Sequence, residues 1–193
     1  MKVFGLTGGM GMGKSTAAEL LRPRVAIVDT DALARQVVEP GKPALAEVRA
    51  LFGPEILAED GRLRREELAR RVFADESARQ KLEAILHPRI RACWQAQIET
   101  WRAEGKKVGV VVIPLLFETN AAACFDASVC VACSAATQRE RLRARGLTPE
   151  QIEQRLQAQW PVEKKLALAD FVVWTEGGLA VHEEQWARII PVA

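Results

Sequence analysis

A group of residues near the N-terminus has the types and spacing needed to bind a chain of phosphates. Gly8, Gly13, Lys14 and Ser15 fit the P-loop pattern G-x-x-x-x-G-K-[ST], and an apolar run at residues 3–6, typical of a strand, precedes them. Backbone N–H groups must converge on phosphate oxygens in such a loop, and side chains larger than hydrogen would block that approach. The helix expected from Lys14 onward would point its positive end at the anion.

The same loop supplies a cation and a metal ligand. The ammonium of Lys14 can bind the β- and γ-phosphates. The hydroxyl of Ser15 is a predicted ligand for Mg²⁺, the expected cofactor. The alternative is a merely tight, flexible turn, but the Lys-Ser pair follows the last glycine at the required offset. We therefore predict that a nucleoside triphosphate, which the later motifs identify as ATP, is bound by Gly8, Gly9, Gly11, Met12, Gly13, Lys14, Ser15 and Thr16.

The hydrophobic pattern predicts an α/β protein of the P-loop NTPase fold. Strands are expected at residues 3–6, 25–28, 108–113, 127–132 and 169–174, and helices at 14–21, 32–38, 44–52, 65–73, 76–104, 136–145 and 179–189. Another helix should begin at Pro149, with Thr148 and Gln151 forming a capping box. Five strands alternating with helices predict a doubly wound parallel sheet that binds its ligand at the carboxyl ends of the strands.

Composition argues against several classes of protein. The 193 residues carry 27 Lys and Arg against 25 Asp and Glu, a net charge of +2 without a dense basic tract, so no nucleic acid is expected as a partner. The longest apolar run, residues 108–117, is too short to span a bilayer and contains Pro114. A strand begins within three residues of Met1, which leaves no room for a signal peptide. These features predict a cytoplasmic protein without a membrane partner.

Four cysteines invite a test for metal binding. Cys130 and Cys133 have the spacing of metal ligands, which leaves a zinc site as one interpretation. However, the sequence has no second such pair, and both histidines lie far away along the chain. Because residues 127–132 have the pattern of a buried strand, we interpret these cysteines as apolar core residues.

The residues beyond the P-loop narrow the class of enzyme. The guanine-specifying element Asn-Lys-x-Asp of GTPases is absent from the sequence. A short chain, a helical segment between the second and third strands, and an arginine-rich helix after the fourth strand favour a small-molecule kinase. In such enzymes catalysis consists of positioning and of charge neutralisation around the transferred phosphoryl group.

Several further motifs are more specific than the P-loop. LTGGMGMGKST is followed by VDTDALARQVVEPG, by G-x-L-x-R at residues 61–65, by His87-Pro88, by PLLFE at residues 114–118, and by Q-x-x-R-x-x-x-R from Gln138 to Arg145. Gln159, Lys165, Ala169 and Asp170 fit the same pattern. With these motifs the sequence resembles the dephospho-CoA kinase family over nearly its whole length.

The resemblance implies a reaction and a division of the chain. The implied reaction is phosphorylation of the ribose 3′-hydroxyl of dephospho-CoA by ATP, which gives CoA and ADP in the last step of coenzyme A synthesis. The implied single kinase domain, residues 1–193, has a nucleotide-binding core at 1–31, 106–135 and 168–193, a helical acceptor-binding insertion at 32–105, and a helical lid at 136–167. ATP and dephospho-CoA are the expected partners, whereas the sequence does not indicate an oligomeric state.

Asp31 is the predicted catalytic base. A carboxylate just beyond the end of a strand can orient a hydroxyl that approaches the γ-phosphate and accept its proton. The alternative is that Asp31 caps a helix that begins at Ala32, but the resemblance favours the catalytic role. Asp29 could serve the metal or the substrate through water, or it could be a strand-end carboxylate with a local hydrogen bond.

Arg141 and Arg145 stand four residues apart on a predicted helix and therefore share a face. Two guanidinium groups above the phosphates would neutralise charge in the transition state, and the resemblance implies that their helix belongs to a lid that closes over ATP. Arg139 and Arg143 form a second such pair, and an arginine-rich helix can also be a solvated face. The register of the motif favours Arg141, with a catalytic role, and Arg145.

The resemblance places acceptor binding in the helical insertion and in the loop after the third strand. The residues implied, besides Asp31, are Arg65, His87, Pro114, Leu115 and Glu118. His87 could instead be a structural residue beside Pro88, and Arg65 an ordinary surface charge. Glu118 could contribute to the metal site, or it could be an ordinary surface acid.

Two positions depart from the patterns of related enzymes. The third strand ends in Ile113 and Pro114, without the Asp that helps to hold Mg²⁺ in many P-loop enzymes, so phosphate oxygens and water would complete the coordination by Ser15. The family pattern has an Asn-rich turn after the fifth strand, whereas this chain has Trp-Thr-Glu-Gly-Gly at residues 174–178. Selectivity for the adenine base is therefore less well specified than phosphate binding.

Two rival functions fit part of the pattern. Another P-loop kinase would phosphorylate a nucleoside or a nucleoside monophosphate, and a screen of acceptors would identify it. A non-catalytic nucleotide sensor would bind ATP without turnover and would not need Asp31. The presence of Lys14, Ser15, Asp31 and the lid arginines together argues against a sensor.

Overall fold

The computed structural model describes residues 1–190, except for the side chain of Phe73. The chain forms two compact units. The first contains Met1–Asp29 and the chain from Ile98 onward, and the second contains Thr30–Gln97.

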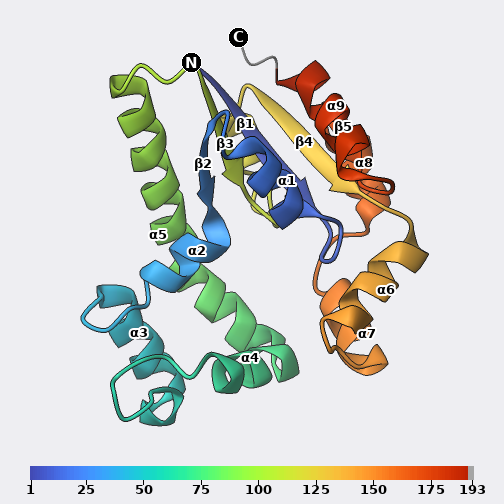
Figure 1. The fold of residues 1–193 in the computed structure, drawn as a ribbon. Coiled ribbons are helices and arrows are strands. Elements are labelled where there is room, and N and C mark those ends of the chain that lie inside the picture. The colour runs from blue at the N-terminus through green and yellow to red at the C-terminus, as the bar shows by residue number, and fades with distance from the viewer. Residues whose placement is uncertain (191–193) are drawn as a thin grey trace. The chain divides into compact units, whose positions relative to one another are not determined.

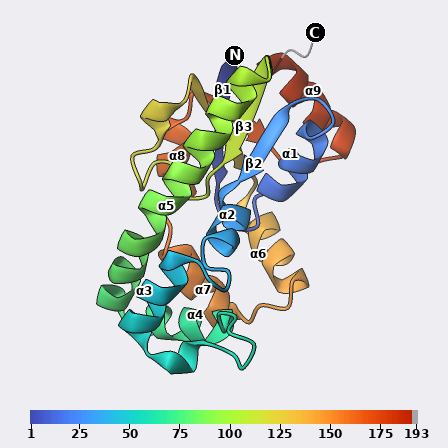
Figure 2. The ribbon, with the colours of Figure 1, turned by 90° about the vertical axis from the view of Figure 1, so that its left-hand side faces the viewer.

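The first unit is built on a five-stranded parallel sheet. Its strands are β1 (Lys2–Gly8), β2 (Ala26–Asp29), β3 (Val108–Val112), β4 (Ala127–Ala132) and β5 (Phe171–Trp174), in the order β2-β3-β1-β4-β5 (Figure 1). Figure 2 shows β2, β3 and β1 as neighbours in that order. This confirms the predicted parallel sheet, although β5 begins at residue 171 rather than at the predicted residue 169. The interior strands are rich in β-branched residues because helices cover both of their faces.

Two helices, α1 (Lys14–Leu21) and α9 (Leu179–Ile189), cover one face of the sheet (Figure 1). The core on that face combines side chains of the strands with Ala17 and Leu21 of α1 and Trp186 of α9. On the opposite face, Val162 and Leu166 of α8 (Val162–Leu168) pack against the end of β4. The sequence did not predict α8.

The C-terminal end of α5 (Glu76–Ala103) lies against a glycine of β3. A Cβ atom added to Gly109 would lie 2.7 Å from a ring carbon of Trp101, so a side chain at this position has no room. Trp101 itself is buried, with 5% of its surface exposed. The pair therefore sets how closely this part of α5 approaches the sheet.

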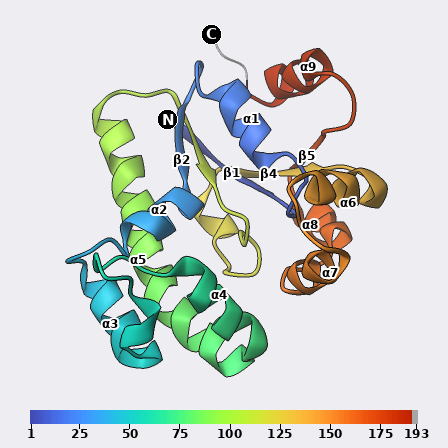
Figure 3. The same ribbon diagram turned by 60° about the horizontal axis from the view of Figure 1, so that its bottom comes forward.

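Helices α6 (Ala135–Ala144) and α7 (Pro149–Gln157) lie side by side beyond β4 (Figure 3). The predicted capping box of α7 is confirmed, since the hydroxyl of Thr148 accepts from the N–H of Gln151 and the side chain of Gln151 accepts from the N–H of Thr148. A short 3₁₀ turn, η2 (Ala122–Cys124), precedes β4.

Strand β5 forms one edge of the sheet, and a side chain from α9 closes part of that edge. The side-chain oxygen of Gln185 accepts from the N–H of Trp174 at 2.8 Å, and its side-chain nitrogen donates to the carbonyl of Trp174 at 2.9 Å. Phe171, Val172 and Trp174 each keep more than 40% of their surface exposed at this edge.

The second unit is helical, with α2 (Thr30–Gln36), α3 (Pro43–Phe52), the 3₁₀ turn η1 (Pro54–Ile56), α4 (Arg65–Ala74) and most of α5. Its core gathers Val48, Ile56 and Leu68, with leucine and isoleucine side chains of α5 packed against them. The predicted helices are confirmed with small shifts in their bounds. The largest shift is that α2 begins at Thr30, two residues earlier than predicted.

Cys130 and Cys133 are buried core residues of the first unit, as the sequence predicted, with 0% and 3% of their surface exposed. Burial raises the pKa of Cys130 to about 11, although Lys165 and Lys14 lower it in part, so its thiol stays protonated near neutral pH. Within residues 1–190, no cluster of His, Cys, Asp and Glu could hold a metal ion. No helix of the described residues is both long and apolar enough to cross a membrane.

Candidate nucleotide-binding site

The loop between β1 and α1 has backbone conformations that favour glycine. Gly8 has φ of +148° and Gly13 has φ of +92°, where Gly13 is the N-cap of α1. A Cβ atom added to Gly8 would lie 2.4 Å from the carbonyl oxygen of Val131, so the loop passes directly over the end of β4. The loop therefore leads directly into the N-terminus of α1, where the N–H groups of the first turn and the helix dipole favour the binding of an anion.

Lys14 folds back over this loop. Its Nζ donates to the carbonyl of Gly8 at 2.8 Å and to that of Gly9 at 2.9 Å. A phosphate is a stronger acceptor for an ammonium group than a neutral carbonyl, so the charge of Lys14 is available at the loop for an incoming anion. Ser15, next along α1, has an exposed side chain.

Arg141 of α6 reaches the same loop through Thr175, which follows β5. Its guanidinium donates to Thr175 Oγ1 at 2.9 Å and to the Thr175 carbonyl at 2.7 Å, with a longer contact of 3.5 Å to the carbonyl of Gly11. Thr175 Oγ1 in turn donates to the carbonyl of Met12 at 3.1 Å. Thr175 is buried. It belongs to the turn at residues 174–178, where this chain lacks the Asn-rich turn of the family pattern, and it orients Arg141 against the loop.

The other arginines of α6 have different surroundings. Arg145 is the C-cap of the helix, one residue beyond its last turn, and is exposed. Arg139 forms an ion pair of 2.9 Å with Glu153 of α7. The structure thus brings Arg141 to the loop, while Arg139 joins two helices at the surface. Of the two arginines that the motif register favours, only Arg141 contacts the loop among the described residues, and Arg145 is exposed at the end of the helix.

Glu176 orders the turn that follows Thr175. Its side chain accepts from the N–H of Ser134 at 2.9 Å and from the ring N–H of Trp174 at 3.1 Å. Hydrogen bonds from Ser134 and Thr137 lower the pKa of Glu176 to about 2. The turn at residues 174–178 is therefore fixed to the N-terminus of α6, and the last turn of the same helix carries Arg141.

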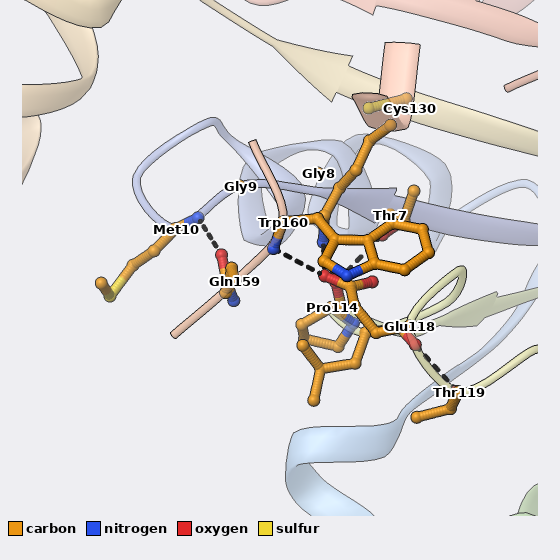
Figure 4. Close-up of polar contacts among 12 residues, drawn as sticks. Thr7, Gly8, Gly9, Met10, Pro114, Glu118, Thr119, Cys130, Gln159 and Trp160 are labelled. Carbon is orange, nitrogen blue, oxygen red and sulfur yellow. Dashed lines mark hydrogen bonds and ion pairs between the residues drawn. The ribbon is translucent and has the colours of Figure 1, made fainter. Parts of the chain in front are cut away.

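Two glutamines bind the tip of the loop at Met10. The side-chain nitrogen of Gln138 donates to the carbonyl of Met10 at 2.7 Å. The N–H of Met10 donates to the side-chain oxygen of Gln159 at 3.1 Å (Figure 4). Both glutamines line a cavity of about 330 Å³ beside the loop, together with Met12 and Trp160. Both belong to the family motifs quoted above, but their contact with Met10 joins residues more than 120 positions apart and could not be predicted.

The loop after β3 holds a buried ion pair. Glu118 Oε1 lies 2.7 Å from Nζ of Lys165, whose side chain is fully buried, while the side chain of Glu118 is 14% exposed. Figure 4 shows Glu118 beside Pro114 and Trp160. Lys165 also donates to the carbonyl of Pro114 at 2.7 Å, and the N–H of Trp160 donates to Glu118 at 3.2 Å. The interpretation of Glu118 as an ordinary surface acid is therefore wrong, because the acid is enclosed and paired with Lys165.

Asp31 lies in the first turn of α2, two residues after the end of β2, and its side chain is exposed. The alternative that Asp31 caps a helix beginning at Ala32 is wrong, because the helix already begins at Thr30. A carboxylate in the first turn still interacts favourably with the helix dipole. Asp29 ends β2 opposite Val112, at the carboxyl edge of the sheet.

In the helical unit, arginines gather at the start of α4. Arg64, Arg65 and Arg70 line a cavity of about 490 Å³ with Glu66 and Glu67. Glu67 is bound by Arg70 and by Arg71, and these hydrogen bonds lower its pKa to about 2. Arg65 makes a contact of 3.4 Å with the carbonyl of Arg35, and His87 is a half-buried residue of α5 that does not line this cavity.

The residues at the loop fit a magnesium ion of the kind that accompanies ATP. Mg²⁺ in nucleotide sites is usually held by one or two protein oxygens, with phosphate oxygens and water completing an octahedron. Ser15 offers an exposed hydroxyl at the first turn of α1, and β3 ends in Val112 without a carboxylate of its own. Ser15 is therefore the protein ligand that this loop can supply.

The central strand of the parallel sheet runs into this glycine-rich loop, a lysine lies over the loop, and an arginine is held beside it. These features define a P-loop kinase. The sequence model of the dephospho-CoA kinase family matches residues 2–180. The chain belongs to that family, which confirms the resemblance seen in its motifs.

Individual relatives agree with this assignment. A dephospho-CoA kinase of Anaeromyxobacter dehalogenans is 50% identical over 179 residues, which cover 92% of this chain and 85% of the relative. The crystal structure of TT1252 from Thermus thermophilus matches with a TM-score of 0.84 and 34% identity, over 97% of this chain and 95% of the other. A dephospho-CoA kinase structure from Campylobacter jejuni has the same fold, with a TM-score of 0.72 and 24% identity over 98% of this chain and 95% of that one.

Proposed function

We propose that this chain transfers the γ-phosphoryl group of ATP to the ribose 3′-hydroxyl of dephospho-CoA, which gives CoA and ADP in the final step of coenzyme A synthesis. The observation that carries the proposal is the phosphate loop with Lys14 folded over it and Arg141 fixed beside it, in a chain of this family. We assign ATP binding to the sheet unit, a lid role to residues 136–167, and acceptor binding to the helical unit Thr30–Gln97.

The proposed chemistry follows from the charges at the loop. Backbone N–H groups from Gly8 to Thr16 would hold the β- and γ-phosphates, and Lys14 would neutralise charge on the transferred group. Arg141, and Arg145 from the proposed lid, would bind the phosphate oxygens on which charge accumulates. Ser15 would hold Mg²⁺, which would supply further positive charge beside the phosphates when bound.

Asp31 is the proposed base for the acceptor. A ribose hydroxyl is a poor nucleophile, and a carboxylate within hydrogen-bond reach would orient it and accept its proton. The exposure of Asp31 supports this role, since its carboxylate can meet an incoming substrate. Arg65, with the arginines around it at the start of α4, is proposed to bind the acceptor's phosphates, with His87, Pro114 and Leu115 as further acceptor contacts.

We also propose a cytoplasmic location without a nucleic-acid partner. ATP as phosphoryl donor and the free cysteines of the described chain support a reducing compartment that contains nucleotides. The near balance of basic and acidic residues, with a net charge of +2, supports a small polyanion rather than nucleic acid as ligand.

A mass-resolved assay of the purified protein with Mg-ATP tests the proposal. Dephospho-CoA should gain one phosphate, the product should require Mg²⁺, and Lys14→Ala should abolish it while leaving the circular dichroism spectrum unchanged. Phosphorylation of a nucleoside or nucleoside monophosphate in place of dephospho-CoA would replace the proposal with another kinase activity. ATP binding by calorimetry without transfer to any acceptor would instead indicate a nucleotide sensor.

A further inference from the structure

We propose that Lys165 is a positioning residue for the phosphate loop, although it lies on α8 and belongs to the opposite face of the sheet from α1. Its buried ammonium joins the end of β1, the loop after β3 and the segment between α7 and α8 into one polar network (Figure 4). The inference rests on the proposed function only for the choice of ATP as the ligand that is measured.

The first part of the network is the buried ammonium of Lys165, which is paired with a carboxylate and a carbonyl. Burying a lysine is costly unless its charge is neutralised and its protons are bound. Lys165 is 0% exposed and meets both conditions, with Glu118 and the carbonyl of Pro114 each at 2.7 Å. An apolar residue would fill the same space without this cost, so we attribute to the pair the role of fixing the geometry of the segments that it joins.

The second part of the network reaches the strand from which the phosphate loop departs. The carbonyl of Pro114 accepts from Lys165 and also from the hydroxyl of Thr7 at 3.1 Å. Thr7 is fully buried and immediately precedes Gly8. Lys165 therefore fixes the loop after β3 against the residue at which the phosphate loop begins.

The third part reaches the tip of the phosphate loop through the chain between α7 and α8. Glu118 Oε1 accepts from the N–H of Trp160, and the neighbouring Gln159 accepts from the N–H of Met10. The ammonium of Lys164 lies 3.3 Å from the centre of the Trp160 ring, which further restrains this segment. One side of the 159–160 segment thus binds the Lys165–Glu118 pair, and the other binds the loop.

Glu118 depends on Lys165 for its place in the network. Its second oxygen, Oε2, is buried and has no hydrogen-bond partner among the described residues. Removing the ammonium would leave an enclosed carboxylate without its partner cation, and the carboxylate would move toward water. The N–H of Trp160 would move with it, and Gln159 would lose its alignment with Met10.

The experiment compares Lys165→Met, Glu118→Gln and the double variant, with Lys81→Met as a matched control at an exposed lysine of α5. Methionine keeps most of the volume of lysine and removes the charge. In hydrogen exchange without ATP, Lys165→Met should speed exchange of peptides that contain Met10 and Trp160. The dissociation constant for ATP should rise about tenfold, as expected from the loss of a loop hydrogen bond, and Lys81→Met should change neither quantity.

The double variant separates positioning from stability. It contains no uncompensated charge, so its melting temperature should recover, while its weak ATP binding and fast exchange at Met10 should persist. Gln159→Leu extends the test to the loop contact, and it should weaken ATP binding to a similar extent without lowering the melting temperature.

A double variant that melts and binds ATP like the wild type, with unchanged exchange at Met10, would overturn the proposal, as would wild-type ATP affinity in Gln159→Leu. These readouts do not involve the acceptor. Persistent effects in a protein that cannot phosphorylate dephospho-CoA would therefore keep this inference and reject only the proposed function.

Discussion

Arg141 and Thr175 form a two-point contact in which the guanidinium binds both the side-chain oxygen and the carbonyl oxygen of the threonine, at 2.9 and 2.7 Å. The hydroxyl of Thr175 in turn donates a hydrogen bond to the carbonyl of Met12 in the phosphate loop. The arginine proposed to act on the phosphates is therefore oriented by the turn after β5, and not by its own helix alone.

Thr175→Val should separate the orientation of Arg141 from its charge. The side chain of valine keeps the shape of threonine but can neither accept from Arg141 nor donate to Met12, and only the backbone carbonyl contact with Arg141 remains. We therefore expect kcat/KM for ATP to fall about three- to tenfold. Steady-state kinetics at varied ATP concentration measures the change. Thr175→Ser keeps the hydroxyl and is expected to retain most of the activity, and equal losses in both variants would count against the orientation role.

Asp31→Asn should reduce turnover while preserving ATP binding. A positioned general base contributes at least about a hundredfold to the rate, and asparagine keeps the size of the side chain but cannot accept the proton. Rapid-quench measurement of kcat, with ATP affinity measured by calorimetry, tests both parts. Asp60→Asn, at an exposed turn of the helical unit, is the matched control. A kcat close to that of the wild type would refute the assignment of Asp31 as base.

The contribution of Glu176 to stability should depend on pH. Hydrogen bonds from Ser134 and Thr137 hold the folded-state pKa of Glu176 at about 2, below its usual 4.5. The folded state therefore favours the carboxylate, so this stabilisation is full above about pH 4.5 and is lost as the pH falls toward about 2.

Urea denaturation of the wild type and of Glu176→Gln at a series of pH values tests this dependence. The wild type should have the higher denaturation midpoint at pH 7, and the two midpoints should converge as the pH is lowered from 4.5 toward 3. A difference that is constant across this range would show that the charge of Glu176 is not what the fold uses.

Gly109→Ala should destabilise the sheet unit. The added methyl group would lie 2.7 Å from the ring of Trp101, and shifting a packed helix to admit it costs about 1–3 kcal/mol. Gly178→Ala is the matched control, because no atom lies within 4 Å of its Cβ position and its φ of −74° suits alanine. Thermal unfolding should show a clear loss for the first variant and little change for the second.

The sequence predicted the sheet and the phosphate loop because both depend on local patterns. Runs of β-branched residues such as 108–112 specify buried parallel strands, and the offset of Lys14 from Gly8 specifies the loop. The capping box at Thr148 was predicted for the same reason, since both of its hydrogen bonds join residues three apart.

Features formed by distant residues could not be predicted from such patterns. Helix α8 has only seven residues, and the buried Lys165 within it has the sequence appearance of a surface charge. Its partner Glu118 lies 47 positions earlier in the sequence. Nothing in the residues around Lys165 or Glu118 indicates that the two form an ion pair. The start of α2 was misplaced because Asp31 suits both the N-cap and the first turn of a helix.

The contact between Gln185 and Trp174 bears on how the protein stays separate from other chains. An open strand edge with exposed Phe171, Val172 and Trp174 could recruit a foreign strand and begin aggregation. The primary amide of Gln185 offers one acceptor and one donor in the arrangement that a neighbouring backbone would use, and it already occupies the outward-facing groups of Trp174. A single side chain on α9 thus ends the sheet by imitating the strand that would otherwise continue it.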